Sequence, residues 1–293
     1  MKIKVGIQLG VNNNQLESAE GFWHIVDDCE RLGFDSLWLS ERASGRVPDN
    51  LSAMAAIAGR TQRLKFGSSV LVVPAYNPVL LAKSLATIDV LSNGRVTLGV
   101  GVGWMREEIE ALGGDFGHRG AVSDEYIAIF KKLWTESPVE HAGKYYSFGP
   151  LRAEPRPVQR PHPPIWIGGH SPAALKRTAR LADGWHPVGA EPDLLEPPEF
   201  ARLLDQLKRE TEAAGRDFAS LTIAFTGRLH HHEQPAPADR KRFTGSAAQL
   251  LEDVQAYRRL GVSELCFDFR RATIAETLEQ MDRFASEVMA RAG

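Results

Sequence analysis

Short runs of aliphatic and β-branched residues alternate along the chain with longer stretches in which apolar residues recur every three or four positions. The short runs predict buried strands, and the three-to-four spacing predicts helices with one buried face. In the first helical stretch, for example, Phe22, Ile25 and Cys29 share a face and Gly33 ends the pattern. We predict strands over 5–9, 36–40, 64–73, 96–102, 164–168, 185–188, 221–226 and 263–269, and helices over 17–32, 51–58, 78–91, 172–182, 198–214, 247–260 and 274–290.

This alternation predicts a parallel sheet covered by helices, and eight strands favour a closed (β/α)8 TIM barrel over an open doubly wound sheet. A length of 293 residues fits one barrel of about 250 residues with insertions, or two domains of roughly 150 residues each. Two stretches rich in Pro, Gly and charge interrupt the pattern, at 141–163 and 230–243, and neither is flanked by a second set of core-forming elements. We therefore predict one barrel domain over 1–293, with both insertions at the C-terminal rim.

Composition and net charge limit the classes of partner that the protein can bind. Hydrophobic residues make up 43% and charged residues 25%, as in ordinary globular proteins, and the net charge of -2 gives no field that would attract nucleic acid or an anionic membrane. Cys29 and Cys266 lie in predicted core segments, so we expect buried thiols and no disulfide. We find neither a signal-peptide pattern nor 18 successive apolar residues, and we expect a cytoplasmic protein.

In a barrel of this kind, chemistry is expected where strands end at the C-terminal rim. Glu41 and Arg42 follow the second predicted strand, and Gly168, Gly169, His170 and Ser171 follow the fifth. A Gly-Gly turn before a helix start leaves free backbone N–H groups at the positive end of the helix, which suits a phosphate. An ordinary serine N-cap would explain the same residues.

The run GVGVGW at 99–104 lacks the last glycine of a dinucleotide-binding fingerprint, so a Rossmann fold is not indicated. Its glycines would let a flat ring or another backbone approach closely, or they serve packing alone. Ser68 and Ser69 lie where a buried strand should be apolar, which indicates either a local backbone irregularity or small residues packed near the barrel mouth.

His230 and His232 would share one face of a strand, and Asp268 could complete a metal site with them, as in metal-dependent hydrolases. Such enzymes take further His and Lys ligands from middle strands, and the sequence has none there. We predict no metal, and we interpret this stretch as an exposed polar insertion.

Four segments, 32–42, 66–113, 119–134 and 163–189, together resemble the bacterial luciferase-like superfamily of flavin and deazaflavin oxidoreductases. The second segment is the most specific, because a strand, a proline-begun helix, a D-x-L-S-x-G-R turn and a G-x-G-x-G-W-x-x-x-E run follow each other in the order that the family shows. The resemblance implies a flavin-like ring across the barrel mouth that carries hydride, and a homodimer formed through barrel helices.

Within this superfamily the chain is similar to the subgroup that uses the deazaflavin coenzyme F-420. The grounds are the compact loops, the Glu41–Arg42 pair, and Ser69-Val70, which matches the place where deazaflavin relatives carry a non-proline cis peptide. The resemblance implies catalytic roles for Glu41 and Arg42, and it implies cofactor contacts for Glu41, Ser69, Val70, Val72 and Glu107 near the ring and for Gly168, Gly169, His170 and Ser171 near the phosphate.

Two residues depart from the pattern. Arg42 stands where many relatives have a proton-donating histidine, and a guanidinium stays protonated at neutral pH, so it would stabilise an oxyanion or hold a substrate carboxylate instead. Trp104 stands where a sugar-phosphate dehydrogenase relative has a carboxylate base, which argues against that substrate.

Three functions remain open at this point. The first is hydride transfer between F-420 and an unidentified small organic substrate. The second is an FMN-dependent monooxygenase, which would need reduced flavin from a partner reductase and a dry pocket. The third is a flavin- or deazaflavin-binding protein without turnover.

Overall fold

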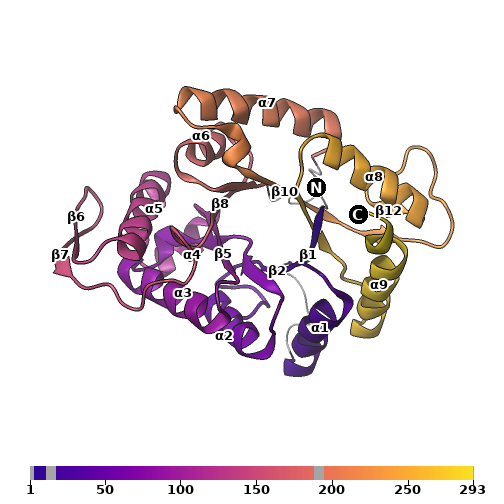
Figure 1. The fold of residues 1–293 in the computed structure, drawn as a ribbon, viewed down its shortest axis with the longest axis horizontal. Helices are drawn as coiled ribbons and strands as arrows, with labels where there is room; N and C mark the ends of the chain where they lie inside the picture. The colour runs from indigo at the N-terminus through magenta and orange to yellow at the C-terminus, as the bar shows by residue number, and fades with distance from the viewer. Residues whose placement is uncertain (1–2, 11–17, 188–194, 293) are drawn as a thin grey trace.

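A computed structural model describes residues 3–10, 18–187 and 195–292 and shows a closed parallel barrel (Figure 1). Neighbouring strands follow the order β3-β2-β1-β13-β10-β9-β8-β5-β4, and pairing of Phe66 on β3 with Val96 on β5 closes the ring. The fold class predicted from the pattern is confirmed. The barrel strands are β1 (Lys4–Leu9), β2 (Ser36–Leu39), β3 (Lys65–Ser68) continued by β4 (Leu71–Val72), β5 (Val96–Gly101), β8 (Ile165–Gly168), β9 (Gly184–His186), β10 (Thr222–Arg228) and β13 (Glu264–Asp268).

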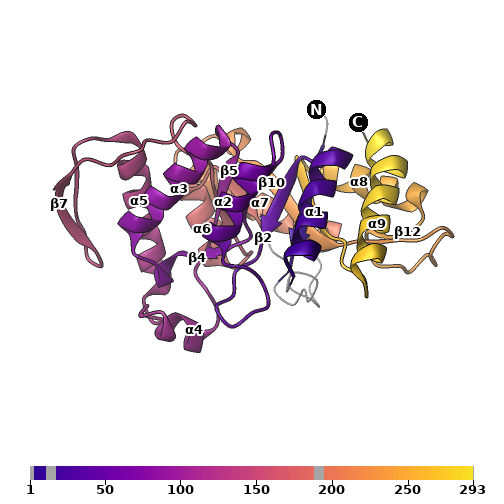
Figure 2. The same ribbon diagram turned by 90° about the horizontal axis from the view of Figure 1, so that it is seen from below.

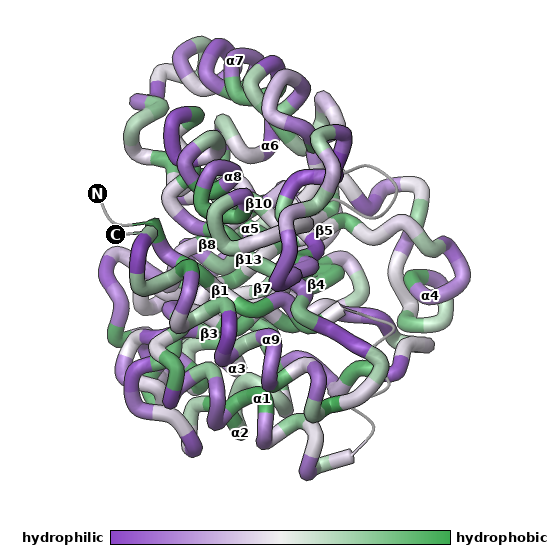
Figure 3. The backbone as a smooth tube through the Cα atoms, turned by 90° about the vertical axis from the view of Figure 1, so that its right-hand side faces the viewer, coloured by the Kyte–Doolittle hydropathy of each residue, from purple (hydrophilic) through white to green (hydrophobic). Residues whose placement is uncertain are grey.

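Helices cover the outside of the barrel (Figure 1). Along α7 (Pro197–Ala213), hydrophilic and hydrophobic residues recur side by side within the helical turns, as expected for a helix with one face on the core (Figure 3). Helix α1 (Ala19–Leu32) ends at a left-handed C-cap, where Gly33 takes φ +83° and donates its N–H to the Cys29 carbonyl. The helices are α1 (Ala19–Leu32), α2 (Asn50–Arg60), α3 (Pro78–Ser92), α4 (Arg106–Ala111), α5 (Arg119–Thr135), α6 (Pro172–Leu181), α7 (Pro197–Ala213), α8 (Ala247–Arg259) and α9 (Ile274–Glu287), with short 3-10 turns at Val73–Ala75, Phe218–Ser220 and Met289–Arg291.

The main apolar core lies between the strands and the helices, and a second, smaller cluster includes Trp38 and Trp166. These two rings stack with centroids 4.8 Å apart. Beside them the buried Glu264 carboxylate accepts hydrogen bonds from Ser36 Oγ at 2.5 Å and Trp38 Nε1 at 3.1 Å. Since β1 separates β2 from β13 in the sheet, these side chains meet inside the barrel, where Gly6 of β1 leaves them room.

The predicted strand 64–73 is divided in two at the Ser69-Val70 peptide bond, which is cis. The Val70 side chain lies against β5 and β8. A Cβ added at Gly101 would lie 2.2 Å from Val70 Cγ2, and one at Gly168 would lie 2.5 Å from Val70 Cγ1. The glycines of the 99–104 run therefore serve packing against this segment, which was one of the two interpretations left open by the sequence.

The first insertion differs from the prediction. Residues 136–163 connect the end of α5 to the start of β8, so they leave the barrel at its N-terminal face, not its C-terminal rim. They form the hairpin β6 (Val139–Ala142) and β7 (Ser147–Leu151), which lies outside α5 (Figure 2). The Glu125 carboxylate of α5 accepts the N–H groups of residues 144–146, and buried Asp89 accepts those of Val158 and Gln159. The second insertion follows β10 and does belong to the C-terminal side; it contains the short pair β11 (His230–His231) and β12 (Thr244–Gly245).

The structure also bears on the predictions for the two cysteines and the sixth strand. Cys29 and Cys266 are free, buried thiols as expected, and burial raises the pKa of both well above its usual range. The sixth strand is β9, and the end predicted for it at position 188 lies outside the described residues. Among the helices that the structure describes, none has the length and apolar character needed to cross a bilayer.

Candidate active site at the C-terminal rim

Glu41 follows β2 directly, and its carboxylate bridges two groups from the β4 segment. Oε2 accepts the backbone N–H of Val72 at 2.5 Å, and Oε1 accepts the hydroxyl proton of Tyr76. Burial raises the pKa of Glu41, and these two hydrogen bonds oppose the rise. Burial and the adjacent carboxylate raise the pKa of the Tyr76 phenol, so Tyr76 keeps its proton at neutral pH.

Arg42 is already paired. Its Nε lies 3.3 Å from Glu108 Oε1, and its guanidinium lies 5.7 Å from the ring centroid of Trp104, which is 77% exposed. Burial of Glu108 opposes ionisation, but hydrogen bonds from the Ser44 hydroxyl and backbone N–H and from Arg42 lower the pKa of Glu108. Because Glu108 already compensates its charge, Arg42 is a weaker site for a substrate carboxylate than the sequence alone suggested.

A cavity of about 390 Å³ opens beside these groups, between the 41–50 loop, the β4–Tyr76 segment and α4. Its wall is mainly apolar, with Val47, Pro48, Ala75, Ile109 and Leu112, and its polar lining comprises Glu41, Arg42, Asp49, Asn50, Tyr76 and Glu108. We call it the acidic cavity, because three carboxyl groups line it against one guanidinium.

A second cavity of about 510 Å³ lies between the starts of α5 and α6. Gly168, Gly169, His170 and Ser171 line it together with Arg119 and Arg177, and its described lining residues include no carboxylate. We call it the basic cavity. Gly169 takes φ +85°, the left-handed conformation expected of the Gly-Gly turn, and Ser171 caps α6 by accepting the Ala174 N–H at 3.2 Å. The N-cap interpretation is thus correct, and it is compatible with the phosphate interpretation.

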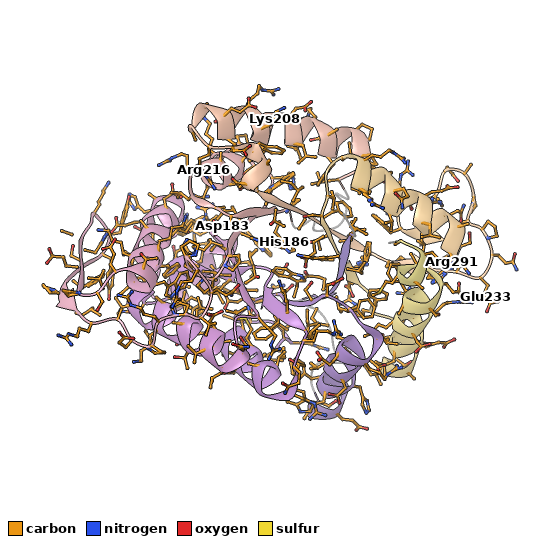
Figure 4. All side chains as sticks on the ribbon, viewed as in Figure 1. Asp183, His186, Lys208, Arg216, Glu233 and Arg291 are labelled. Atoms are coloured by element: carbon orange, nitrogen blue, oxygen red, sulfur yellow. The ribbon has the colours of Figure 1, made fainter. Side chains whose placement is uncertain are left out.

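His186 lies at the end of β9 in the middle of the barrel, as its label in Figure 4 shows. Its Nε2 is 2.8 Å from Ser69 Oγ, and its ring stacks on Trp38 with centroids 4.8 Å apart. Burial lowers the pKa of His186 to about 3, so the imidazole is neutral at physiological pH. Ser69 therefore points into the barrel and is held there, while its neighbour Val70 contacts the rim glycines.

Most of the predicted site residues meet at the rim, in one cavity or the other. Glu41, Arg42 and Val72 line the acidic cavity, and residues 168–171 line the basic one. Three predicted residues line neither cavity. Ser69 bonds to His186 inside the barrel, and Val70 packs against the rim glycines. Glu107 lies exposed on α4, while Glu108 faces the acidic cavity. Successive helical residues point about 100° apart, so an uncertainty of one position in the sequence decides which carboxylate enters the site.

Several residues that the structure brings to these cavities could not be found from the sequence pattern. Asn50, Tyr76, Arg119 and Arg177 belong to helices or turns whose role at the rim depends on tertiary packing. A polar residue within a predicted buried strand was a usable signal for His186.

The histidine run does not form the arrangement considered for a metal. His230 and His232 are exposed, whereas His231 is buried with Nε2 3.2 Å from Glu287 Oε2, so the run is not wholly an exposed insertion. Over residues 3–10, 18–187 and 195–292, no three His, Cys, Asp or Glu side chains are placed to hold a metal ion.

A closed parallel barrel with paired polar cavities at its C-terminal rim defines a (β/α)8 protein whose site is built by the loops after the strands. The chain belongs to the luciferase-like monooxygenase family, whose model matches residues 3–263. The predicted resemblance is confirmed. Proteins of this family are oxidoreductases or monooxygenases, and some of the similar proteins use coenzyme F420, the deazaflavin F-420.

Among curated proteins, the chain is 30% identical over 244 residues to the uncharacterized protein Rv0953c of Mycobacterium tuberculosis (strain ATCC 25618 / H37Rv), a match that covers 83% of this chain and 77% of that protein. It is 37% identical over 167 residues to the F420-dependent glucose-6-phosphate dehydrogenase of Amycolatopsis mediterranei (strain U-32), covering 54% of this chain and 50% of that enzyme.

Solved structures establish the fold at lower identity. The monooxygenase RslO1 from Streptomyces bottropensis superposes with a TM-score of 0.85 at 22% identity, covering 99% of this chain and 100% of that one. The coenzyme F420 dependent tetrahydromethanopterin reductase from Methanopyrus kandleri gives 0.83 at 15%, with full coverage of both. The FMN complex of the oxygenating constituent of 3,6-diketocamphane monooxygenase from Pseudomonas putida gives 0.78 at 18%, covering 99% of both.

Proposed function

We propose that this protein is an F-420-dependent oxidoreductase that transfers hydride between the coenzyme and a small organic substrate. One observation carries the proposal: the acidic and basic cavities adjoin along a single segment, since Val102 lines the basic cavity and Gly103 the acidic one. A coenzyme with a ring at one end and a phosphate at the other needs two such compartments.

The residues present fit that coenzyme. In the basic cavity, Arg119, the N-terminal end of α6 and the buried Nδ1 of His170, which has no hydrogen-bond partner among the described residues, suit a phosphate. Arg177 also lines the cavity, but its charge is partly compensated by Asp124, which together with the Gly120 carbonyl fixes its orientation. Gly168, Gly169, His170 and Ser171 would hold the phosphate, and Glu41, Val70 and Val72 would contact the ring.

The deazaflavin would supply a carbon centre that accepts or gives up hydride. The side chains of the protein would hold protons, stabilise charge and exclude water around this centre. Tyr76 keeps its proton on Oη and donates it in a hydrogen bond to Glu41 Oε1, which orients the carboxylate. Glu41, whose pKa is raised by burial, would accept a proton and return it. Arg42 would stabilise negative charge that develops on a substrate oxygen, with Glu108 fixing its orientation. The apolar wall of the acidic cavity would exclude water from these groups once a ligand fills the cavity.

One observation favours the second candidate, an FMN-dependent monooxygenase using reduced flavin from a partner reductase. The rim carries Arg42 where a dehydrogenase of the resembled type has an imidazole acid, and an oxygenating enzyme does not need that acid. A passive carrier of flavin or deazaflavin is the third candidate.

Fluorescence titration with F-420 and with FMN, each oxidised and reduced, tests the proposal. Micromolar binding of F-420 alone supports hydride transfer, preference for reduced FMN supports the monooxygenase, and binding of neither rejects both. Glu41→Gln and Arg42→Ala then separate an enzyme from a carrier, because both substitutions should slow turnover in an enzyme and have no functional effect on a carrier.

We further infer a homodimer that forms through α2 and α3. α3 exposes Leu80 at 63% and Leu91 at 64%, and the adjacent α2 exposes the small residues Ala56 and Gly59, which would allow a second helix to approach closely. Sedimentation equilibrium should show a dimer for the wild type and a monomer for Leu91→Lys. A dimer that persists in Leu91→Lys, or a monomeric wild type, rejects this interface. Leu112→Lys is the matched control, since Leu112 is exposed just after α4.

A further inference from the structure

Asn50 is the first residue of α2 and lines the acidic cavity, yet its amide has no hydrogen-bond partner among the residues that the structure describes. The residue is 1% exposed, and both Nδ2 and Oδ1 are buried without a partner. Nearly all buried polar groups in proteins are satisfied, so a side chain with both ends unpaired requires an explanation.

Helix capping does not provide one. The N-cap of α2 is Asp49, whose Oδ1 accepts the Ser52 N–H at 2.8 Å, so the start of the helix is satisfied without Asn50. An apolar side chain of similar size would fill the same volume without leaving two unpaired atoms. The amide is therefore costly for the fold. It is enclosed in this conformation, so a ligand in the cavity would reach it by a small shift of the cavity wall.

The surroundings restrict which ligand this could be. Glu41, Asp49 and Glu108 outnumber Arg42 among the charged lining residues, and Arg42 is engaged by Glu108. An anionic ligand would meet this excess of negative charge, so a neutral polar group is favoured. The rest of the wall, including the exposed Trp104, offers apolar and aromatic surface.

We propose that Asn50 binds the neutral, planar edge of a ligand that presents a hydrogen-bond acceptor next to a donor, as in a carboxamide, lactam or imide, the rest of the ligand lying on the apolar wall. Nδ2 donates to the ligand's carbonyl and Oδ1 accepts from its N–H. Two sources share this chemistry: a substrate amide, and the pyrimidine edge of a flavin or deazaflavin ring. The inference rests on the proposed function only in naming these two sources.

The test compares Asn50→Leu with the wild type, and uses Ser52→Ala as the matched control on the exposed side of the same helix turn. Saturation-transfer NMR measures the binding of three probes: benzamide with both donor and acceptor, acetophenone with the acceptor alone, and benzoate with a negative charge. Fluorescence titration measures FMN and F-420 in parallel. Far-UV circular dichroism confirms that each variant is folded.

For the wild type we expect benzamide to bind more tightly than acetophenone or benzoate. In Asn50→Leu we expect about a tenfold loss of affinity for benzamide, or for the two ring coenzymes, because two neutral hydrogen bonds disappear. Loss with benzamide identifies a substrate amide, and loss with FMN or F-420 identifies the ring edge. Ser52→Ala should match the wild type.

The inference is overturned if a folded Asn50→Leu binds benzamide, FMN and F-420 as the wild type does, which would mean that the amide binds only water. It is equally overturned if the wild type binds none of them at millimolar concentration. Failure of the proposed function is distinguishable: if benzamide binding depends on Asn50 while neither coenzyme binds, the inference holds and the cofactor assignment falls.

Discussion

The Val70 side chain packs closely between Gly101 and Gly168, so Gly101→Ala should destabilise the protein by a steric clash with Val70. Shortening Val70 should relieve this clash. The new Cβ would lie 2.2 Å from Val70 Cγ2, whereas ordinary contacts begin at 3.4 Å. Val70 or the strand must therefore move by about 1.2 Å, the difference between these two distances. Overpacking of this kind costs about 1–3 kcal/mol in the free energy of unfolding.

Urea unfolding followed by circular dichroism measures this cost, and a double mutant identifies its origin. Val70→Ala alone should lose about 1.5 kcal/mol of buried methyl groups. In the double variant the methyl group added at position 101 fills the space that Val70 gives up, so the combined cost should fall short of the sum of the two by about 1 kcal/mol or more. Gly149→Ala on β7 is the control of opposite sign: nothing lies within 4 Å of its added Cβ, and alanine is favoured over glycine within a strand by about 0.5–1 kcal/mol.

If the cost of the double variant equals the sum of the two single costs to within about 0.5 kcal/mol, the proposed steric clash between positions 70 and 101 is refuted, because the effects of independent sites are additive. The same variants bear on function, since Val70 is proposed to contact the coenzyme ring. A displaced Val70 should weaken F-420 binding in Gly101→Ala, whereas binding should be unchanged in Gly149→Ala. Equal affinity in both would remove Val70 from the proposed ring site.

Individual contacts support three further predictions. Since burial raises the pKa of Glu41 in the folded protein above its ordinary 4.5, the protonated side chain favours the folded state, and this contribution to stability is lost as the pH rises. Glu41→Gln should therefore gain stability relative to the wild type as the pH rises above 4.5 in urea titrations, and a pH-independent difference would contradict this. Asp253 is fully buried and accepts from Arg240 Nη1 at 2.5 Å and the Phe243 N–H at 2.7 Å; Asp253→Ala should cost about 3–5 kcal/mol in the free energy of unfolding, and a cost below about 1 kcal/mol would show that the site relaxes. Asn50→Leu should raise the free energy of unfolding by about 1 kcal/mol, because it removes two unsatisfied polar atoms. Calorimetry without ligand measures this, and a lower melting temperature than that of the wild type would contradict it.

Part of the site could be located from the sequence because strand ends can be found from local pattern. Glu41 and Arg42 were placed at the rim by the apolar run before them, and Gly168 to Ser171 by the strand and proline that flank them. Tyr76 was not found, because its bond to Glu41 spans 35 positions and depends on where the chain after β3 lies relative to the end of β2. The choice between Glu107 and Glu108 depends on the orientation of a six-residue helix, which carries too little hydrophobic pattern to fix its rotation.

The order of strands and helices was determined by the sequence itself, because the periods of strand and helix are local properties of the chain. Barrel closure followed from their number. The tertiary structure alone decided that the hairpin after α5 lies at the N-terminal face, that His186 is buried, neutral and bonded to Ser69, and that an unpaired amide on α2 lines the same cavity as three carboxyl groups. These outcomes depend on distances between residues far apart in the chain, and such distances exist only once the barrel has closed.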